Sequence, residues 1–220
     1  MHKYSGSLLR HSFLVVVVVG IPGVGKSTVV NLARNFLEEK GFKSLVLNYG
    51  DFMLEELSDK GIVKSRDELR RLPLRIQLIH QANAARRMIR FAERELENLG
   101  TRGVLFIDTH LLIRTSSGFW PGLPLHVASE FMPDLIALIE AEPYEIIERQ
   151  KRDTSRYRGD YSDPRLIEEL LELNRREALV VATLTGSSIK IIRNNEGRAE
   201  EAARELVESI ISLSTTHYKV

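Results

Sequence analysis

Residues 20–27 have the sequence GIPGVGKS, which fits the pattern G-x-x-x-x-G-K-S, and they directly follow the apolar run 13–19. A buried strand, a glycine-rich turn and a helix in this order form a loop whose backbone N–H groups converge on an anion. The glycines permit the turn because they lack a Cβ, and the helix beginning near Lys26 adds its positive dipole end. The pattern predicts an α/β fold with a phosphate-binding loop after its first strand.

The side chains of this loop indicate a nucleoside triphosphate as the ligand. Lys26 supplies a mobile charge for the β- and γ-phosphates, and the Ser27 hydroxyl is the expected Mg²⁺ ligand. The alternative is a glycine-rich turn that binds nothing, which the flanking strand and helix disfavour. The predicted ATP-binding residues are Gly20, Ile21, Pro22, Gly23, Val24, Gly25, Lys26, Ser27 and Thr28.

Composition excludes several classes of function. The 31 Lys and Arg balance 30 Asp and Glu, and the net charge of +1 provides no overall field for nucleic acid or an anionic membrane. We therefore expect neither as a partner. The chain has no cysteine, so thiol catalysis, disulfides and thiolate metal sites are excluded, and a reducing cytoplasm is the expected location.

The 220 residues suit one domain, along which β-branched runs alternate with helical patterns. This alternation predicts a parallel sheet with helices on both faces. The strands are expected at residues 13–19, 44–48, 104–108, 135–140 and 189–193. The helices are expected at residues 26–40, 51–60, 74–99, 144–150, 164–183 and 198–213. Residues 49–73 and 151–163 do not fit the alternation and are candidates for moving segments.

A second signal is the apolar strand 103–108, which ends in Asp108. A carboxylate at this point is expected beside Ser27 across the sheet, where it would hold Mg²⁺ directly or through water. An aspartate at a strand end is by itself more often a turn residue, but the phosphate loop favours the metal role. We expect His110 to have a structural hydrogen-bonding role, because no metal-spaced cluster accompanies it.

A third signal is the arginine-rich segment 149–160. A phosphoryl group in transfer spreads negative charge over its oxygens, and arginines that close over it would neutralise that charge. We assign Arg149, Arg156 and Arg158 this role, together with Lys26. The alternative is a solvated charged surface, which we expect for Lys151 and Arg176.

A fourth group of polar residues follows the second predicted strand. Gln77 and Gln81 are four residues apart, so they share one helix face, where their amides could contact a base edge. A polar helix surface explains them nearly as well. The expectation of an acceptor site therefore rests on Arg70 and Arg86 and on the position of this insertion opposite the phosphate loop.

Taken together, these motifs resemble the archaeal-type adenylate kinases, a branch of the nucleoside monophosphate kinases, over residues 13–213. The combination of Asp108-Thr109-His110 with a later Pro-Gly-Leu-Pro is specific to that family, whereas the loop alone is not. The segments that carry the resemblance are 20–28, Asn48-Tyr49-Gly50-Asp51, Arg66-Asp67-x-x-Arg70, 104–110, 118–124, Pro133-Asp134, 149–158 and 184–186.

The resemblance implies a P-loop nucleoside monophosphate kinase fold with a five-stranded parallel sheet in the order 2-3-1-4-5. It implies Mg²⁺-dependent, reversible transfer from ATP to AMP giving two ADP, without a zinc site, by a homotrimer. It divides the single domain 1–220 into a core (13–48, 101–150 and 164–213), an AMP-binding insertion (about 49–100) and a short lid (about 151–163).

The resemblance also assigns individual roles. AMP-phosphate ligands are expected at Arg70 and Arg86, and Arg114 matches an arginine or lysine of the family in the loop after Asp108-Thr109-His110. Arg149 is expected to stack on the ATP adenine, and Arg156 and Arg158 to neutralise the transferring phosphoryl group.

The nature of the acceptor separates the remaining hypotheses. An AMP phosphate oxygen is already ionised at neutral pH, so no general base is needed. A kinase for a small-molecule hydroxyl would need one, and Asp51 is the carboxylate placed to act. A kinase for another nucleoside monophosphate also stays open. A GTPase-like regulator is disfavoured because the guanine-contacting N-K-x-D motif is absent, and the weak net charge disfavours an RNA-maturation factor.

Overall fold

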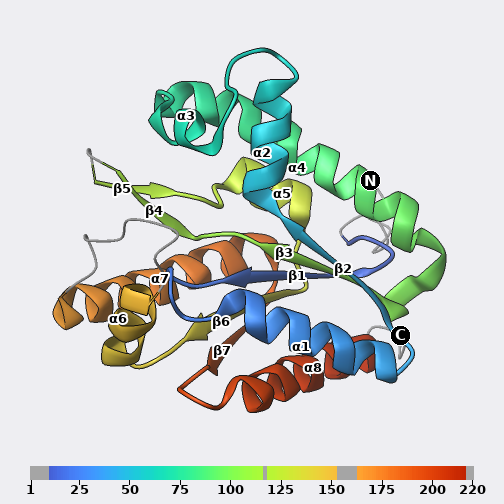
Figure 1. The fold of residues 1–220 in the computed structure, drawn as a ribbon. Helices are drawn as coiled ribbons and strands as arrows, with labels where there is room; N and C mark the ends of the chain where they lie inside the picture. The colour runs from blue at the N-terminus through green and yellow to red at the C-terminus, as the bar shows by residue number, and fades with distance from the viewer. Residues whose placement is uncertain (1–9, 116–117, 153–162, 217–220) are drawn as a thin grey trace.

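The computed structural model describes residues 10–115, 118–152 and 163–216. Helices and strands alternate along most of this chain (Figure 1). In chain order the elements are β1 (Leu14–Val19), α1 (Lys26–Glu39), β2 (Lys43–Asn48), α2 (Tyr49–Ser58), α3 (Arg66–Arg71), α4 (Leu74–Leu96), the 3₁₀-helix η2 (Glu97–Arg102), β3 (Gly103–Asp108), β4 (Leu112–Thr115), β5 (Gly118–Pro121), α5 (Leu125–Phe131), β6 (Leu135–Glu140), α6 (Pro143–Arg152), α7 (Pro164–Thr185), β7 (Ser188–Arg193) and α8 (Ala199–Thr216).

Five parallel strands form the main sheet in the order β2-β3-β1-β6-β7. This is the predicted order 2-3-1-4-5 once the two strands of the separate hairpin, β4 and β5, are left out of the numbering. β1 is therefore the central strand, paired with β3 on one edge and with β6 on the other. The phosphate loop begins where this strand ends.

The core consists of two apolar layers, one on each face of the sheet. Side chains of a strand alternate between its faces, and β1 supplies both layers. Val15, Val17 and Val19 pack with residues of α2, α4, α5 and the end of α7. Val16 and Val18 pack with residues of α1, α6, α8 and the start of α7. All of these valines are fully buried, so the sheet is covered on both sides, as predicted.

The predicted strands agree with the structure to within one residue at each end, and the predicted helices to within three. The long helix ends at Leu96 rather than residue 99, where the backbone tightens into η2. Sequence analysis missed three short elements, α3, α5 and the β4–β5 hairpin. Among the described helices, none combines the length and the apolar character that crossing a membrane requires.

The carboxyl ends of the parallel strands meet at one edge of the sheet (Figure 1). The loop after β1, the starts of α2 and α6 and the β4–β5 hairpin all gather there. Ligands of open α/β sheets bind at this edge, so the fold places the phosphate loop, Asp108 and the start of the insertion near one site.

Candidate active site

The loop after β1 has the backbone of an anion cradle. Gly20, Gly23 and Gly25 have φ angles of 153°, 95° and 84°, which other residues rarely adopt. A Cβ on Gly20 would lie 2.5 Å from the carbonyl oxygen of Ile139 on the neighbouring strand. α1 begins at Lys26, so its positive dipole end faces the loop. The predicted phosphate loop is confirmed in its shape.

Two buried amides hold the loop from outside. Gln150 donates from Nε2 to the carbonyl oxygen of Pro22 at 2.6 Å, and Asn194 donates from Nδ2 to that of Val24 at 2.7 Å. Gln150 is 8% exposed and Asn194 is 4% exposed. Because both carbonyls are engaged by groups outside the loop, the peptide planes are held with their N–H groups turned the other way. Sequence analysis missed both residues.

Asn194 also explains why position 25 is a glycine. A Cβ on Gly25 would overlap the Nδ2 atom of Asn194. The backbone of the loop therefore approaches this amide more closely than any side chain would allow.

Lys26 and Asp108 meet at the base of the loop, a contact that the sequence analysis did not predict. Lys26 Nζ donates to the carbonyl oxygen of Gly20 at 3.0 Å and lies 3.8 Å from Asp108 Oδ1. Asp108 ends β3 opposite Val18 of β1, which fixes this proximity through strand register. The cation and the carboxylate thus face the same space at the sheet edge.

His110 contacts the same loop. Its Nδ1 atom lies 3.2 Å from the carbonyl oxygen of Gly20. Since a carbonyl oxygen only accepts, Nδ1 carries the proton in this contact. The predicted hydrogen-bonding role of His110 is confirmed.

The donor set at this edge fits a small hard cation. The Ser27 hydroxyl, in the first turn of α1, and the Asp108 carboxylate are oxygen donors of the kind that Mg²⁺ prefers. Among the described residues, no group of three or more His, Cys, Asp and Glu side chains is arranged to hold a metal. A metal here would therefore take few protein ligands and would complete its shell with phosphate oxygens and water.

Arg149 lies against the outer side of the loop. Its Nη1 donates to the carbonyl oxygen of Val24 at 3.4 Å, and its Nη2 donates to that of Asn194 at 2.9 Å. Glu145 and Glu196 pair with the same guanidinium. Arg149 is thus placed beside the phosphate loop, whereas Arg156 and Arg158 lie outside the described residues.

The acceptor insertion is built on the contact of α2 with α4. The Tyr49 hydroxyl, at the start of α2, donates to the carbonyl oxygen of Gln81 at 2.8 Å. Burial raises the pKa of Tyr49, so it remains a neutral donor at physiological pH. Gln81 is 3% exposed, and its Oε1 atom is buried without a hydrogen-bond partner among the described residues.

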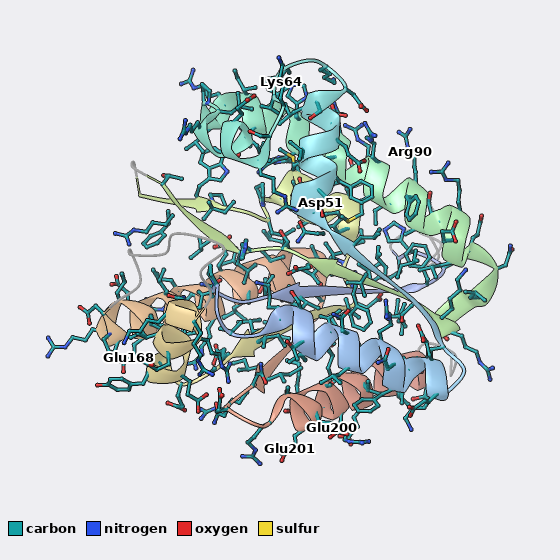
Figure 2. All side chains as sticks on the ribbon, viewed as in Figure 1. Asp51, Lys64, Arg90, Glu168, Glu200 and Glu201 are labelled. Atoms are coloured by element: carbon teal, nitrogen blue, oxygen red, sulfur yellow. The ribbon has the colours of Figure 1, made fainter. Side chains whose placement is uncertain are left out.

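Asn48 joins the two halves of the site. Its Nδ2 donates to Asp108 Oδ2 at 3.0 Å, and its Oδ1 accepts from Arg66 Nη2 at 3.4 Å. Arg66 also forms a close ion pair with Asp51. Figure 2 shows Asp51 at the end of α2 nearest the sheet and Lys64 at the outer end of the insertion. These contacts form a polar chain from the phosphate loop to the insertion.

Comparison with known proteins identifies the family of this chain. A family model described as "AAA domain" matches residues 19–168. The chain is 47% identical to the adenylate kinase of Saccharolobus solfataricus over 195 residues, which cover 89% of this chain and 98% of the relative. It is 44% identical to that of Methanopyrus kandleri, over 90% of this chain and 98% of the relative. The chain belongs to the adenylate kinases.

The same family is found at greater distance. The adenylate kinase of Methanocaldococcus jannaschii is 38% identical over 88% of this chain and 96% of the relative. The crystal structure of TT1252 from Thermus thermophilus has a TM-score of 0.53 at 17% identity and covers 92% of this chain and 98% of its own. That similarity shows the fold alone. The suspected family resemblance is confirmed.

The other residues predicted for the AMP site lie in different surroundings. Arg86, on α4, lies 3.4 Å from Glu130 of α5 and donates to Asn83. Gln77 donates to the carbonyl oxygen of Leu72, at the junction of α3 and α4. Arg114 is exposed on β4. Arg70 belongs to α3, but its side chain lies outside what the structure describes.

The two residues expected to face solvent do so. Lys151 has 65% of its side chain exposed, and Arg176 has 72%. Arg175, which directly precedes Arg176, instead donates twice to Glu140, at 2.8 and 2.6 Å. This hydrogen bonding raises the pKa of Arg175. The pair lines a cavity of about 250 Å³ between α6, α7 and β7, which no residue of the phosphate loop lines.

Proposed function

We propose that this adenylate kinase family member transfers a phosphoryl group reversibly from Mg-ATP to AMP, giving two ADP. The observation that carries the proposal is the pair Lys26 and Asp108, 3.8 Å apart beneath a glycine loop. The α2–α4 insertion opens from the same sheet edge. The relatives at 38–47% identity, all named adenylate kinase, support the same activity.

The donor nucleotide is bound by the loop 20–28. Its inward N–H groups and the dipole of α1 receive the phosphates, and Lys26 exchanges its carbonyl partner for a fully charged phosphate oxygen. Ser27 and Asp108 would hold Mg²⁺, which neutralises charge on the phosphate oxygens. Arg149, at the outer side of the loop, is proposed to lie along the adenine.

The acceptor needs no general base. The AMP phosphate oxygen is already ionised, so the protein aligns it with the donor and neutralises the charge. We propose Arg70, Arg86 and Arg114 for the AMP phosphate and Arg156 and Arg158 for the phosphoryl group in transfer. Gln77 and Gln81 are proposed for the base. Because Gln81 is buried, its contact with a base requires its side chain to shift.

The alternative acceptor is a small-molecule hydroxyl with Asp51 as base. In the structure Asp51 is ion-paired with Arg66, so its carboxylate is engaged by a cation rather than directed at an alcohol. This contact favours the AMP reaction. A kinase for another nucleoside monophosphate would differ from an adenylate kinase only in its contacts with the acceptor base. Assays with CMP, UMP and GMP in place of AMP distinguish the two.

We further propose that the enzyme is cytoplasmic and that it works as a homotrimer. It also includes the division of the domain into a core, an AMP-binding insertion at about 49–100 and a lid at about 151–163. Light scattering on the purified full chain measures the oligomeric state directly, and a monomeric mass would contradict the trimer.

The proposed activity is tested on purified protein with ATP or GTP as donor. The acceptors are AMP, CMP, UMP, GMP and a panel of hydroxylated metabolites, each with Mg²⁺. We expect ATP and AMP to be the best pair. Asp51→Asn separates the two mechanisms. If Asp51 is the general base of a hydroxyl kinase, the variant loses turnover, whereas in the AMP reaction it loses acceptor affinity at most. Turnover of a hydroxyl compound alone, abolished by Asp51→Asn, would contradict the proposal.

A further inference from the structure

Asn48 is held beside Asp108 by the sheet itself. The two residues end neighbouring parallel strands, β2 and β3, and are paired in register. Asn48 Nδ2 donates to Asp108 Oδ2 at 3.0 Å, across 60 residues of sequence. Since a carboxylate only accepts, the amide nitrogen must face it, and the orientation of the amide is determined.

The oxygen of the amide also has a partner. Asn48 Oδ1 accepts from Arg66 Nη2 at 3.4 Å, and Arg66 is itself paired with Asp51. Behind it, a Cβ on Gly50 would lie only 3.1 Å from the same oxygen. The site therefore requires a short side chain with a donor on one side and an acceptor on the other, which asparagine provides.

This arrangement divides the two oxygens of Asp108 between different partners. Oδ2 accepts from Asn48, while Oδ1 lies 3.8 Å from Lys26 Nζ. A carboxylate without the amide would be free to rotate and to place both oxygens against the lysine ammonium. The hydrogen bond from the Asn48 amide prevents this rotation and keeps Oδ1 directed toward the phosphate loop.

We propose that Asn48 is a positioning residue, which fixes the Asp108 carboxylate so that Oδ1 is presented to the cation of the bound nucleotide. The inference rests on the proposed function, since it concerns the residue that would hold Mg²⁺ there. Partners one step removed from a metal ligand commonly change metal affinity by about 10- to 100-fold when they are replaced.

The test uses Asn48→Ala, which removes the amide donor without adding a charge beside Asp108. Mn²⁺ is titrated into the protein with ATP and followed by electron paramagnetic resonance. The apparent Mn²⁺ dissociation constant should rise about 10- to 100-fold. ATP binding in EDTA, measured by calorimetry, should change by no more than about twofold, because the loop that binds the phosphates is untouched.

Two further variants complete the design. In Gly50→Ala the added methyl group crowds the Asn48 amide oxygen, and this variant should weaken Mn²⁺ binding less than Asn48→Ala does. Asn35→Ala, at an exposed position on α1, makes the same chemical change away from the site and should leave Mn²⁺ binding unchanged. If Asn48→Ala does not fold, the Mn²⁺ affinity of Gly50→Ala decides whether the proposal holds.

Two results would overturn the proposal. One is unchanged Mn²⁺ affinity in both Asn48→Ala and Gly50→Ala. The other is an equal loss of ATP binding in EDTA, which would make Asn48 a purely structural residue. Neither titration contains AMP, so failure of the wild-type protein to phosphorylate AMP would refute the proposed function without deciding the role of Asn48.

Discussion

At the scale of single residues, two buried amide side chains from outside the phosphate loop hold its backbone. Gln150 and Asn194 engage the carbonyl oxygens of Pro22 and Val24 from outside. A peptide plane has its N–H opposite its C=O, so holding the carbonyl outward also holds the donor inward. The two hydrogen bonds therefore favour the cradle shape of the loop.

Replacing Asn194 tests this view of the loop. Asn194→Asp keeps the shape but sets a carboxylate against the carbonyl of Val24, leaving buried polar groups without a partner at a cost of about 1–3 kcal/mol. We expect ATP to bind about tenfold more weakly, as measured by calorimetry. Asn35→Asp, at an exposed position on α1, is the matched control. Unchanged ATP affinity in a folded Asn194→Asp protein would show that the loop keeps its shape unaided.

The residues of the phosphate loop could be predicted from the sequence, whereas Gln150 and Asn194, which hold the loop from outside, could not. Gly20 to Ser27 were predicted because the chemistry lies within eight consecutive residues. Asn194 is separated from Val24 by 170 residues, and Gln150 from Pro22 by 128. Only the fold brings these pairs together. Nothing in their local sequence distinguishes them from other buried amides.

At the scale of elements, long periodic segments were predictable and short ones were not. The five strands of the sheet carry apolar or β-branched runs that identify them. By contrast, β4 and β5 have four residues each, and α3 has six, too few to show a period. Their pairing depends on neighbours that the local sequence does not specify.

The packing of α2 on α4 includes a buried carboxylate. Glu56 is 6% exposed and is contacted by His80 at 3.1 Å, Lys60 at 3.1 Å and Asn83 at 3.3 Å. Burial raises the pKa of Glu56, but these hydrogen bonds together outweigh it, so the pKa is lowered overall. The charged carboxylate therefore stabilises the contact between the two helices of the insertion.

This contact predicts a pH dependence of stability. A lowered pKa means that the stabilisation is present above the ordinary glutamate value of about 4.3 and is lost as pH falls through the folded-state value. Glu56→Gln should lower the free energy of unfolding at pH 7 by about 1.5–3 kcal/mol. The difference from wild type should shrink below about pH 4.

Urea titrations across this pH range measure the difference. Glu200→Gln is the control, because Glu200 is exposed on α8, as Figure 2 shows, and pairs only at the surface with Arg204. Its effect should stay below about 1 kcal/mol. A Glu56→Gln difference that stayed constant down to pH 3 would argue against the role of the charge.

At the scale of the whole molecule, stability comes from the two apolar layers, and chemistry is confined to one edge of the sheet. Leu37 lies near the end of α1 far from the phosphate loop and is fully buried in one layer. The fold class and the strand order were both predicted, the order through the family resemblance. The packing of particular side chains depends on three-dimensional neighbours, which no periodicity reveals.

The separation of core from site makes a further prediction. Leu37→Ala should lower the free energy of unfolding by about 2–5 kcal/mol through loss of contacts and a residual cavity. The turnover number of the folded protein should not change. Leu179→Ala is the matched control, since Leu179 is 61% exposed on α7 and should change stability by less than about 0.5 kcal/mol. Thermal unfolding and steady-state assays measure both quantities.

The strand order also determines which strands face outward at the sides of the sheet. β2 and β7 occupy these margins, and they carry Lys43, Lys190 and Arg193. A strand from another molecule that approached either margin would have to strip water from these cations. We therefore expect these charges to disfavour extension of the sheet by foreign strands and edge-to-edge aggregation of crowded or refolding molecules.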